Sequence, residues 1–230
     1  MKKIDLLILL IIFSYLLLLF FDNKDILLHF LITIFNERSL KSIPLNKKLI
    51  NKVHEILNKI NTKKFTFIDF GSGYGNILKE FHYYFPKLIG IELESNSYNE
   101  SKKILKYYEN IILINDSMEN FKFPNENIIF YIYEPLYFLF DCKKVNEIYE
   151  KVIYNLNQSN INNNNNNEVR CNKIYIIYIK ENNISRLLKN CEQKDKLFSK
   201  YNFLLTDIYY ENLFPFEREM EIYEYNNIPL

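Results

Sequence analysis

A short glycine-rich segment carries the residues whose types and spacing best suit ligand chemistry. It spans residues 68–76, reads IDFGSGYGN, and places Asp69 two positions before its first glycine, Gly71. Glycine tolerates positive φ angles and lets the backbone approach a ligand closely. If the segment joins a strand to a helix, the N–H groups of the first helical turn can face a polar or anionic group. The segment therefore predicts a ligand-binding loop at a strand-to-helix turn.

The composition of the chain makes this loop more informative. The chain has 230 residues but only 4 glycines, where average usage would give about 16. Alanine and tryptophan are absent, and Asn, Ile, Lys, Tyr and Phe are in excess. This skew is typical of an AT-rich coding sequence, so richness in Lys, Asn or Tyr says little about function. The positions of the remaining glycines say more, and all of them lie within residues 71–90: Gly71, Gly73, Gly75 and Gly90.

Two further carboxylates follow the apolar segments after the loop. Glu92 ends the segment IGIE at residues 89–92, and Asp116 lies in NDSM at residues 115–118. Strands of a parallel sheet end at a common edge, and open α/β sheets bind their ligands there. We therefore expect Asp69, Glu92 and Asp116 at one edge of a sheet. A carboxylate at that edge can accept two hydroxyl groups or attract a cation.

At these residues the sequence resembles the class I S-adenosylmethionine-dependent methyltransferases. Their first motif is an acidic residue followed by x-G-x-G-x-G, and residues 69–75 match every position. The resemblance implies S-adenosyl-L-methionine as the cofactor, with Asp69 at its amino group and Glu92 at its ribose hydroxyls. It also implies that Asp116, with Ser117 beside it, contacts the adenine. The residues implied to cradle the methionine part are Gly71, Ser72, Gly73 and Gly75. The resemblance covers about residues 60–226.

The segment after the expected fourth strand bears on the acceptor. Glu134 and Pro135 lie where amine methyltransferases often carry Asn/Asp-Pro-Pro-Phe/Tyr. The outline is also similar to an uncharacterised branch and to membrane-anchored and histone-type lysine methyltransferases. The resemblance implies Glu134 and Pro135 as catalytic residues and a lysine-like amine of a protein as the methyl acceptor. Methyl transfer to nitrogen depends mainly on alignment, so the lack of a Cys–His or Ser–His pair is no objection.

Two other functions remain open. The sequence departs from the family outline at Asn76, where an Arg is usual, and at Glu134, which replaces the Asn. Both departures are compatible with a catalytically inactive cofactor-binding scaffold tethered to a membrane. A dinucleotide-dependent oxidoreductase is less favoured, because its G-x-G-x-x-G fingerprint needs a third glycine where Asn76 stands.

The elements that must position these residues alternate between strands and helices. Apolar runs predict strands at residues 65–70, 88–93, 111–114, 128–133 and 174–179, and the alternation of polar and apolar residues predicts two more at 203–210 and 219–225. Helical spacing predicts helices at residues 49–60, 77–85, 97–108, 141–156 and 184–190. The pattern predicts an α/β fold with a doubly wound, mostly parallel seven-stranded sheet. A low-complexity Asn-rich loop is expected at residues 158–172.

The N-terminal segment is strongly apolar. Residues 6–21 read LLILLIIFSYLLLLFF without a charge, slightly short of the ~17–25 residues that span a bilayer. No small-residue cleavage site follows, which favours an uncleaved anchor over a signal peptide; a buried N-terminal helix is the alternative. We therefore expect residues 1–35 to be a hydrophobic anchor or targeting segment, 36–64 a connecting helix, and 65–230 the cofactor-binding domain. The expected location is a membrane, with mitochondria and other organelles left open.

Charge and cysteines limit the partners. Lys plus Arg number 29 and Asp plus Glu number 28. A chain so close to neutral argues against nucleic acid as the main partner. The three cysteines, Cys142, Cys171 and Cys191, are odd in number and lack zinc-site spacing. We therefore predict no metal site, no disulfide framework and no nucleic-acid partner.

Overall fold

The computed structural model describes residues 47–133, 142–161, 173–181, 198, 200–201, 203–213 and 216–225. The chain divides into two compact units, residues 1–40 and 41–230, and every described residue belongs to the second. The apolar run at residues 6–21 and the rest of the expected anchor lie outside the described residues. Among the helices that are described, none has both the length and the apolar character needed to cross a membrane.

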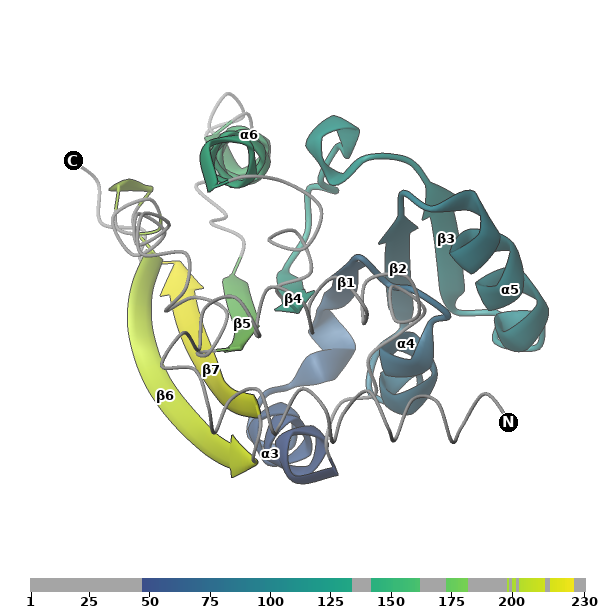
Figure 1. Ribbon diagram of the computed structural model, residues 1–230, viewed down its shortest axis with the longest axis horizontal. Helices are drawn as coiled ribbons and strands as arrows, with labels where there is room; N and C mark the ends of the chain where they lie inside the picture. Colours follow the sequence, from purple (N-terminus) through teal and green to yellow (C-terminus); the bar gives the residue numbers. More distant parts are fainter. Residues whose placement is uncertain are drawn as a thin grey trace, which may run out of the picture. The chain divides into compact units, whose positions relative to one another are not determined.

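A single seven-stranded sheet has the order β3-β2-β1-β4-β5-β7-β6 (Figure 1). Strands β1 to β5 are parallel to one another, and β7 lies between β5 and β6 and is antiparallel to both. The strands are β1 (Thr66–Phe70), β2 (Lys87–Glu92), β3 (Ile111–Asn115), β4 (Ile128–Tyr133), β5 (Ile174–Glu181), β6 (Phe203–Leu213) and β7 (Phe216–Tyr225). The predicted α/β class and mostly parallel seven-stranded sheet are confirmed.

Helices cover both faces of the sheet (Figure 1). On one face, α3 (Lys47–Leu57), α4 (Asn76–Phe81) and α5 (Ser95–Leu105) contribute to one buried cluster. On the other face, α6 (Cys142–Ile161) packs within a second cluster. The helical spacing of α3 explains its packing, because its buried residues recur at intervals of three and four along one stripe: Leu49, Val53, Ile56 and Leu57.

The central strands are buried on both faces. In β1, Phe67 belongs to the cluster under α3 and α4, whereas Ile68 and Phe70 belong to the cluster under α6. Alternate residues of a strand point to opposite faces, so Asp69 shares the face of Phe67. Near-continuous apolar runs of this kind are typical of parallel sheets covered by helices. From β1 the chain adds β2 and β3 on one side, and it then returns to add β4 on the other side of β1. Folds of this kind bind their ligands at such a switch point.

Several element boundaries differ from the sequence prediction by a few residues, among them the ends of α4 and α6. Helical spacing predicted a helix over residues 77–85, but α4 ends at Phe81. The amide Nδ2 of Asn110 donates to the carbonyl of His82 at 2.7 Å and to that of Phe85 at 3.0 Å, in the turn that follows the helix. In addition, α6 runs to Ile161 and so includes the first residues of the expected Asn-rich loop at 158–172.

Candidate functional site

The glycine-rich segment forms the turn between β1 and α4. Its three glycines adopt φ angles of 75°, 53° and 79° at Gly71, Gly73 and Gly75. Residues other than glycine rarely adopt such φ angles. The N–H groups of Gly71 and Ser72 donate to the carbonyl of Ile91 in β2, at 2.9 Å and 3.1 Å. The loop is therefore bound to the neighbouring strand, and Gly75 begins α4 as its N-cap.

Two glycines also permit close packing behind the loop. A Cβ atom at Gly75 would collide with Cδ1 of Leu105, so the start of α4 lies directly against α5. A Cβ atom at Gly90 would lie 2.5 Å from Cδ1 of Leu78 and 2.9 Å from Oγ of Ser72. Gly90 thus lets the loop and α4 pack onto β2.

The Ser72 side chain points into this packed region. Ser72 is 7% exposed, and its hydroxyl has no hydrogen-bond partner within the described part of the chain. The oxygen lies against the site where Gly90 lacks a side chain. The predicted contact of Ser72 with the cofactor stays a prediction; in the structure the Ser72 hydroxyl lies toward β2, and its N–H donates to the carbonyl of Ile91. In this arrangement Ser72 serves the packing of the loop.

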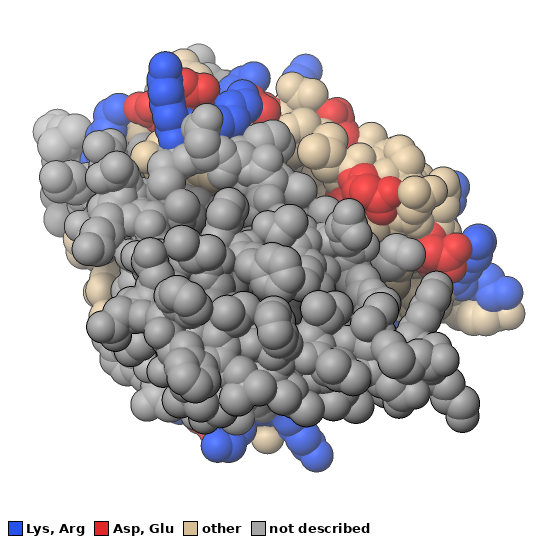
Figure 2. Space-filling view, viewed as in Figure 1, with Lys and Arg blue, Asp and Glu red and all other residues tan. Residues whose placement is uncertain are grey.

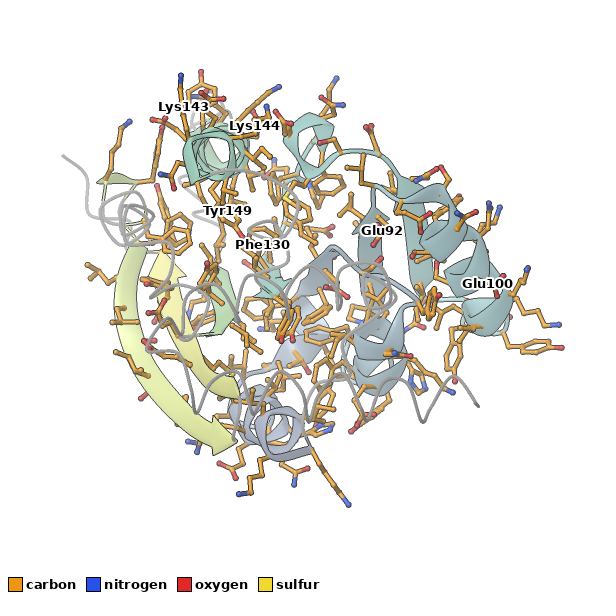
Figure 3. The ribbon with its side chains drawn as sticks, viewed as in Figure 1. Glu92, Glu100, Phe130, Lys143, Lys144 and Tyr149 are labelled. Atoms are coloured by element: carbon orange, nitrogen blue, oxygen red, sulfur yellow. The ribbon has the colours of Figure 1, made fainter. Side chains whose placement is uncertain are left out.

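Glu92 connects the end of β2 to the loop (Figure 3). Its Oε2 accepts a hydrogen bond from the N–H of Gly73 at 2.8 Å, and its Oε1 accepts one from the N–H of Glu94 at 2.8 Å. A carboxylate offers about four lone-pair sites. Each oxygen of Glu92 therefore keeps acceptor capacity for one more donor, which suits a pair of adjacent hydroxyl groups.

Asp69 lies at the base of the same loop. It pairs in register with Gly90 and is 3% exposed. Burial, and to a smaller extent the negative charge of Glu92, raise the pKa of the Asp69 carboxyl to about 8. No described residue donates a hydrogen bond to it, and a buried carboxylate without a partner is costly. A cation at this position would stabilise its ionised form.

The predicted adenine contacts follow β3. Asn115 pairs in register with Glu92, so Asp116 lies one residue further along its strand direction than the residue beside Glu92. Its Oδ1 accepts hydrogen bonds from Nδ2 of Asn120 at 3.0 Å and from the N–H of Ser117 at 2.6 Å, and both lower the pKa of Asp116. Asp116 is exposed and ionised, and its Oδ2 is not used in these bonds. Ser117 caps the short helix η2 (Met118–Asn120).

Two residues that the sequence analysis missed brace this edge. Asn115 donates from Nδ2 to the carbonyl of Glu92 at 2.8 Å and to that of Leu93 at 3.2 Å. Glu94 caps α5 through its carboxylate, which accepts from the N–H groups of its first turn. Nothing local distinguishes Asn115 in a chain rich in Asn. A glutamate is not among the preferred N-cap residues, so Glu94 gave no signal either.

The structure thus brings Asp69, the glycine loop and Glu92 together and places Asp116 one strand further along the edge. The predicted catalytic residues Glu134 and Pro135 lie outside the described residues. Within the ranges that are described, no group of three or more His, Cys, Asp or Glu residues is placed to hold a metal ion.

Comparison with known proteins places this arrangement among solved folds. No protein-family model and no curated protein sequence matches the chain. Among solved structures, it is similar to the N-methyltransferase NodS from Bradyrhizobium japonicum WM9, with a TM-score of 0.56 and 10% identity over 79% of this chain and 99% of that one. A NodS structure in complex with S-adenosyl-L-homocysteine has a TM-score of 0.54, with 10% identity over 76% of this chain and 86% of that one.

Other similar structures come from different proteins. The methyltransferase domain of bacterial CtHen1-C has a TM-score of 0.55 and 16% identity over 78% of this chain and 98% of that one. A SAM-dependent methyltransferase from Leishmania major has a TM-score of 0.55 and 14% identity over 76% of this chain and 70% of that one. Identities this low establish the fold alone, and the chain has the fold of the class I S-adenosylmethionine-dependent methyltransferases.

Proposed function

We propose that the chain is a methyltransferase that uses S-adenosyl-L-methionine. The observation that carries the proposal is the contact between the glycine loop and Glu92. Gly73 donates its N–H to the Glu92 carboxylate, and the buried Asp69 lies at the base of the same loop. The loop, a hydroxyl-accepting carboxylate and a buried carboxylate therefore meet at the carboxyl edge of β1 and β2.

These residues fit the chemical groups of the cofactor. S-adenosyl-L-methionine carries an ammonium group, a sulfonium, two ribose hydroxyls and an adenine amine. Asp69 supplies a buried carboxyl that lacks a donor and suits the ammonium group. Glu92 keeps one acceptor site on each oxygen for the hydroxyls. Asp116 is ionised, with Oδ2 directed to no described partner, and can accept from the adenine amine.

The hydrogen bonds of the loop argue against a dinucleotide cofactor. A pyrophosphate is usually held by N–H groups at such a turn. Here four N–H groups of the loop already donate to oxygen atoms of the protein: Gly71 and Ser72 to Ile91, Gly73 to Glu92, and Gly75 to Ser72. The Glu92 carboxylate also lies against the turn, and its negative charge would repel a pyrophosphate.

Charge supports an amine as the acceptor. The segments at the carboxyl edge, residues 65–78, 88–101 and 111–121, contain no Lys or Arg but include Asp69, Glu92, Glu94 and Asp116. An edge of this charge attracts a cationic ligand and repels phosphate groups. At the top and right of the view in Figure 2, described Lys and Arg side chains lie beside Asp and Glu side chains. These features favour a lysine-like amine of a protein over a nucleic acid.

The bound cofactor would supply an electrophilic methyl group on its sulfonium. The chain's own residues would bind the cofactor and hold the acceptor in line with it, since alignment supplies most of the acceleration. Glu134 and Pro135 follow β4 directly in the sequence, and we assign to Glu134 the hydrogen bond that orients the acceptor amine. Residues 6–21 would tether the enzyme to a membrane, which their uninterrupted apolar sequence supports.

Calorimetric titration of the full-length chain with S-adenosyl-L-homocysteine tests the cofactor assignment. We expect one binding site per chain, and loss of binding in Gly73→Val. A β-branched residue is strongly disfavoured at the φ of 53° found there, and its strain would displace the N–H from Glu92. Absence of binding by the folded wild-type chain, or unchanged affinity in Gly73→Val, would contradict the proposal.

A methyl-transfer screen separates an enzyme from an inactive scaffold. The chain is mixed with radiolabelled cofactor and with membrane and soluble fractions of a lysate, each tested separately. We expect labelled protein, and loss of the label in Glu134→Ala. Cofactor binding without transfer in any fraction would favour the scaffold, and label in RNA would contradict the protein acceptor.

A further inference from the structure

Asn115 makes more side-chain contacts than an exposed strand end requires. Its Nδ2 donates to the backbone carbonyls of Glu92 and Leu93, at 2.8 Å and 3.2 Å. Its Oδ1 accepts from the hydroxyl of Ser95, the first residue of α5, at 3.0 Å. One amide therefore ties the end of β3 to the end of β2 and to the start of α5.

These contacts continue into the glycine loop. The carbonyl that Asn115 holds belongs to Glu92, whose carboxylate accepts from the N–H groups of Gly73 and Glu94. Moving the backbone of Glu92 would move this carboxylate away from Gly73. A chain of hydrogen bonds thus runs from β3 through Asn115 and Glu92 to the loop after β1.

We propose that Asn115 is a positioning residue for the cofactor site. Asn115 acts through Glu92: it holds the backbone of Glu92 so that the Glu92 carboxylate can contact both the glycine loop and the ribose hydroxyls. The proposal rests on the proposed function, since it concerns the same site. Asn115 is assigned no contact with the cofactor, and its amide has partners on both its nitrogen and its oxygen.

The chain offers a matched control at the other end of the same strand. Asn110 immediately precedes β3, and its Nδ2 also donates to two backbone carbonyls, those of His82 and Phe85, at 2.7 Å and 3.0 Å. Asn110 braces the amino edge of the sheet, away from the loop and Glu92. Asn110→Ala and Asn115→Ala therefore remove the same kind of bonds from opposite ends of β3.

The experiment compares both variants with the wild-type full-length chain. Affinity for S-adenosyl-L-homocysteine is measured by titration calorimetry, and stability by thermal unfolding. We expect Asn115→Ala to bind about tenfold more weakly, because the lost bonds include the one that holds the backbone carbonyl of Glu92. Asn115→Asp should bind more weakly still, since a carboxylate oxygen would face the carbonyls. Asn110→Ala should lower the melting temperature at least as much while leaving the affinity within about twofold of wild type.

Amide hydrogen exchange without ligand gives a second readout. In Asn115→Ala we expect faster exchange at the N–H groups of Gly73 and Glu94, with unchanged exchange in β4 and β5. Wild-type affinity in Asn115→Ala, equal loss of affinity in Asn110→Ala, or unchanged exchange at Gly73 and Glu94 would each overturn the inference. Failure of the wild-type chain to bind overturns the proposed function, and is recognised because it needs no variant.

Discussion

Glu92 shows at the scale of one residue how a side chain can order a loop and still bind a ligand. Its two oxygens hold the N–H groups of Gly73 and Glu94, and each oxygen keeps capacity for another donor. A glutamine at this position would have one acceptor oxygen and one NH₂ group. The NH₂ group cannot accept a hydrogen bond, either from a backbone N–H or from a hydroxyl.

We therefore predict that Glu92→Gln weakens binding of S-adenosyl-L-homocysteine roughly 30-fold, or about 2 kcal/mol, the usual loss for a hydrogen bond to a charged group. Calorimetric titration measures the change. The control is Glu100→Gln, which makes the same chemical change on α5, where Glu100 pairs with Lys103 at 2.6 Å on the surface (Figure 3). A similar loss in both variants would show that general charge, and not the position of Glu92, sets the affinity.

Sequence reasoning reached some residues of the site and missed others for a physical reason. Asp69, Glu92 and Asp116 were predictable because each stands at a fixed distance from the end of an apolar strand. The direction of the Ser72 hydroxyl depends on the missing side chain of Gly90, which lies in another strand. Asn115 acts on a carbonyl 23 residues away, and no local pattern records such a contact.

At the scale of elements, the first turn of α4 depends on a glycine that the helix behind it requires. Gly75 has a φ of 79°, and a Cβ atom there would collide with Leu105 of α5. The N-cap position of α4 thus combines a backbone that disfavours L-residues with a contact at which the Leu105 side chain would have to shift to admit a methyl group.

We predict that Gly75→Ala lowers the free energy of unfolding by about 2 kcal/mol or more, combining positive-φ strain with overpacking. Urea unfolding followed by circular dichroism measures this loss. The double variant Gly75→Ala/Leu105→Ala removes the collision and keeps the strain, so its loss should be smaller than the sum of the two single losses. Simple additivity would show that Leu105 does not oppose the methyl group.

The strands were easier to predict than the helix ends. Five strands were predicted from apolar runs, because burial on both faces leaves few polar residues in β1, β4 and β5. The last two strands were predicted from the alternation of polar and apolar residues. The end of α4 was misplaced, and Asn110 binds the carbonyls of His82 and Phe85 in the turn that follows it. Such bonds join distant segments and leave no trace in helical spacing.

At the scale of the whole molecule, the proton on Asp69 links the site to global stability. Burial and the charge of Glu92 raise the pKa of Asp69 to about 8 in the folded, ligand-free chain, from an ordinary value of 3.8. Between these values the folded chain binds one more proton than the unfolded chain. This contribution to stability is therefore complete below about pH 4 and is lost as the pH rises through about 8.

We predict that the free energy of unfolding of the ligand-free chain falls by up to about 3 kcal/mol from this group between about pH 5.5 and about pH 7.5. Urea unfolding at both pH values measures the fall. Asp69→Asn cannot ionise and should lack this part of the pH dependence. Saturating S-adenosyl-L-methionine should reduce it in the wild type, since a cation beside Asp69 lowers the pKa of its carboxyl. Equal pH dependence in Asp69→Asn and wild type would contradict the assignment.

The hydrogen bond from Gly73 to Glu92 joins two groups of the chain itself and needs no ligand atom to complete it. Ordering the backbone of one residue costs roughly 1–2 kcal/mol of conformational entropy. For this loop that cost falls on folding and not on association, so the chain meets its cofactor in a pre-organised state. The heat-capacity change of binding should then reflect only the surface that the ligand buries, without the larger signature of coupled folding.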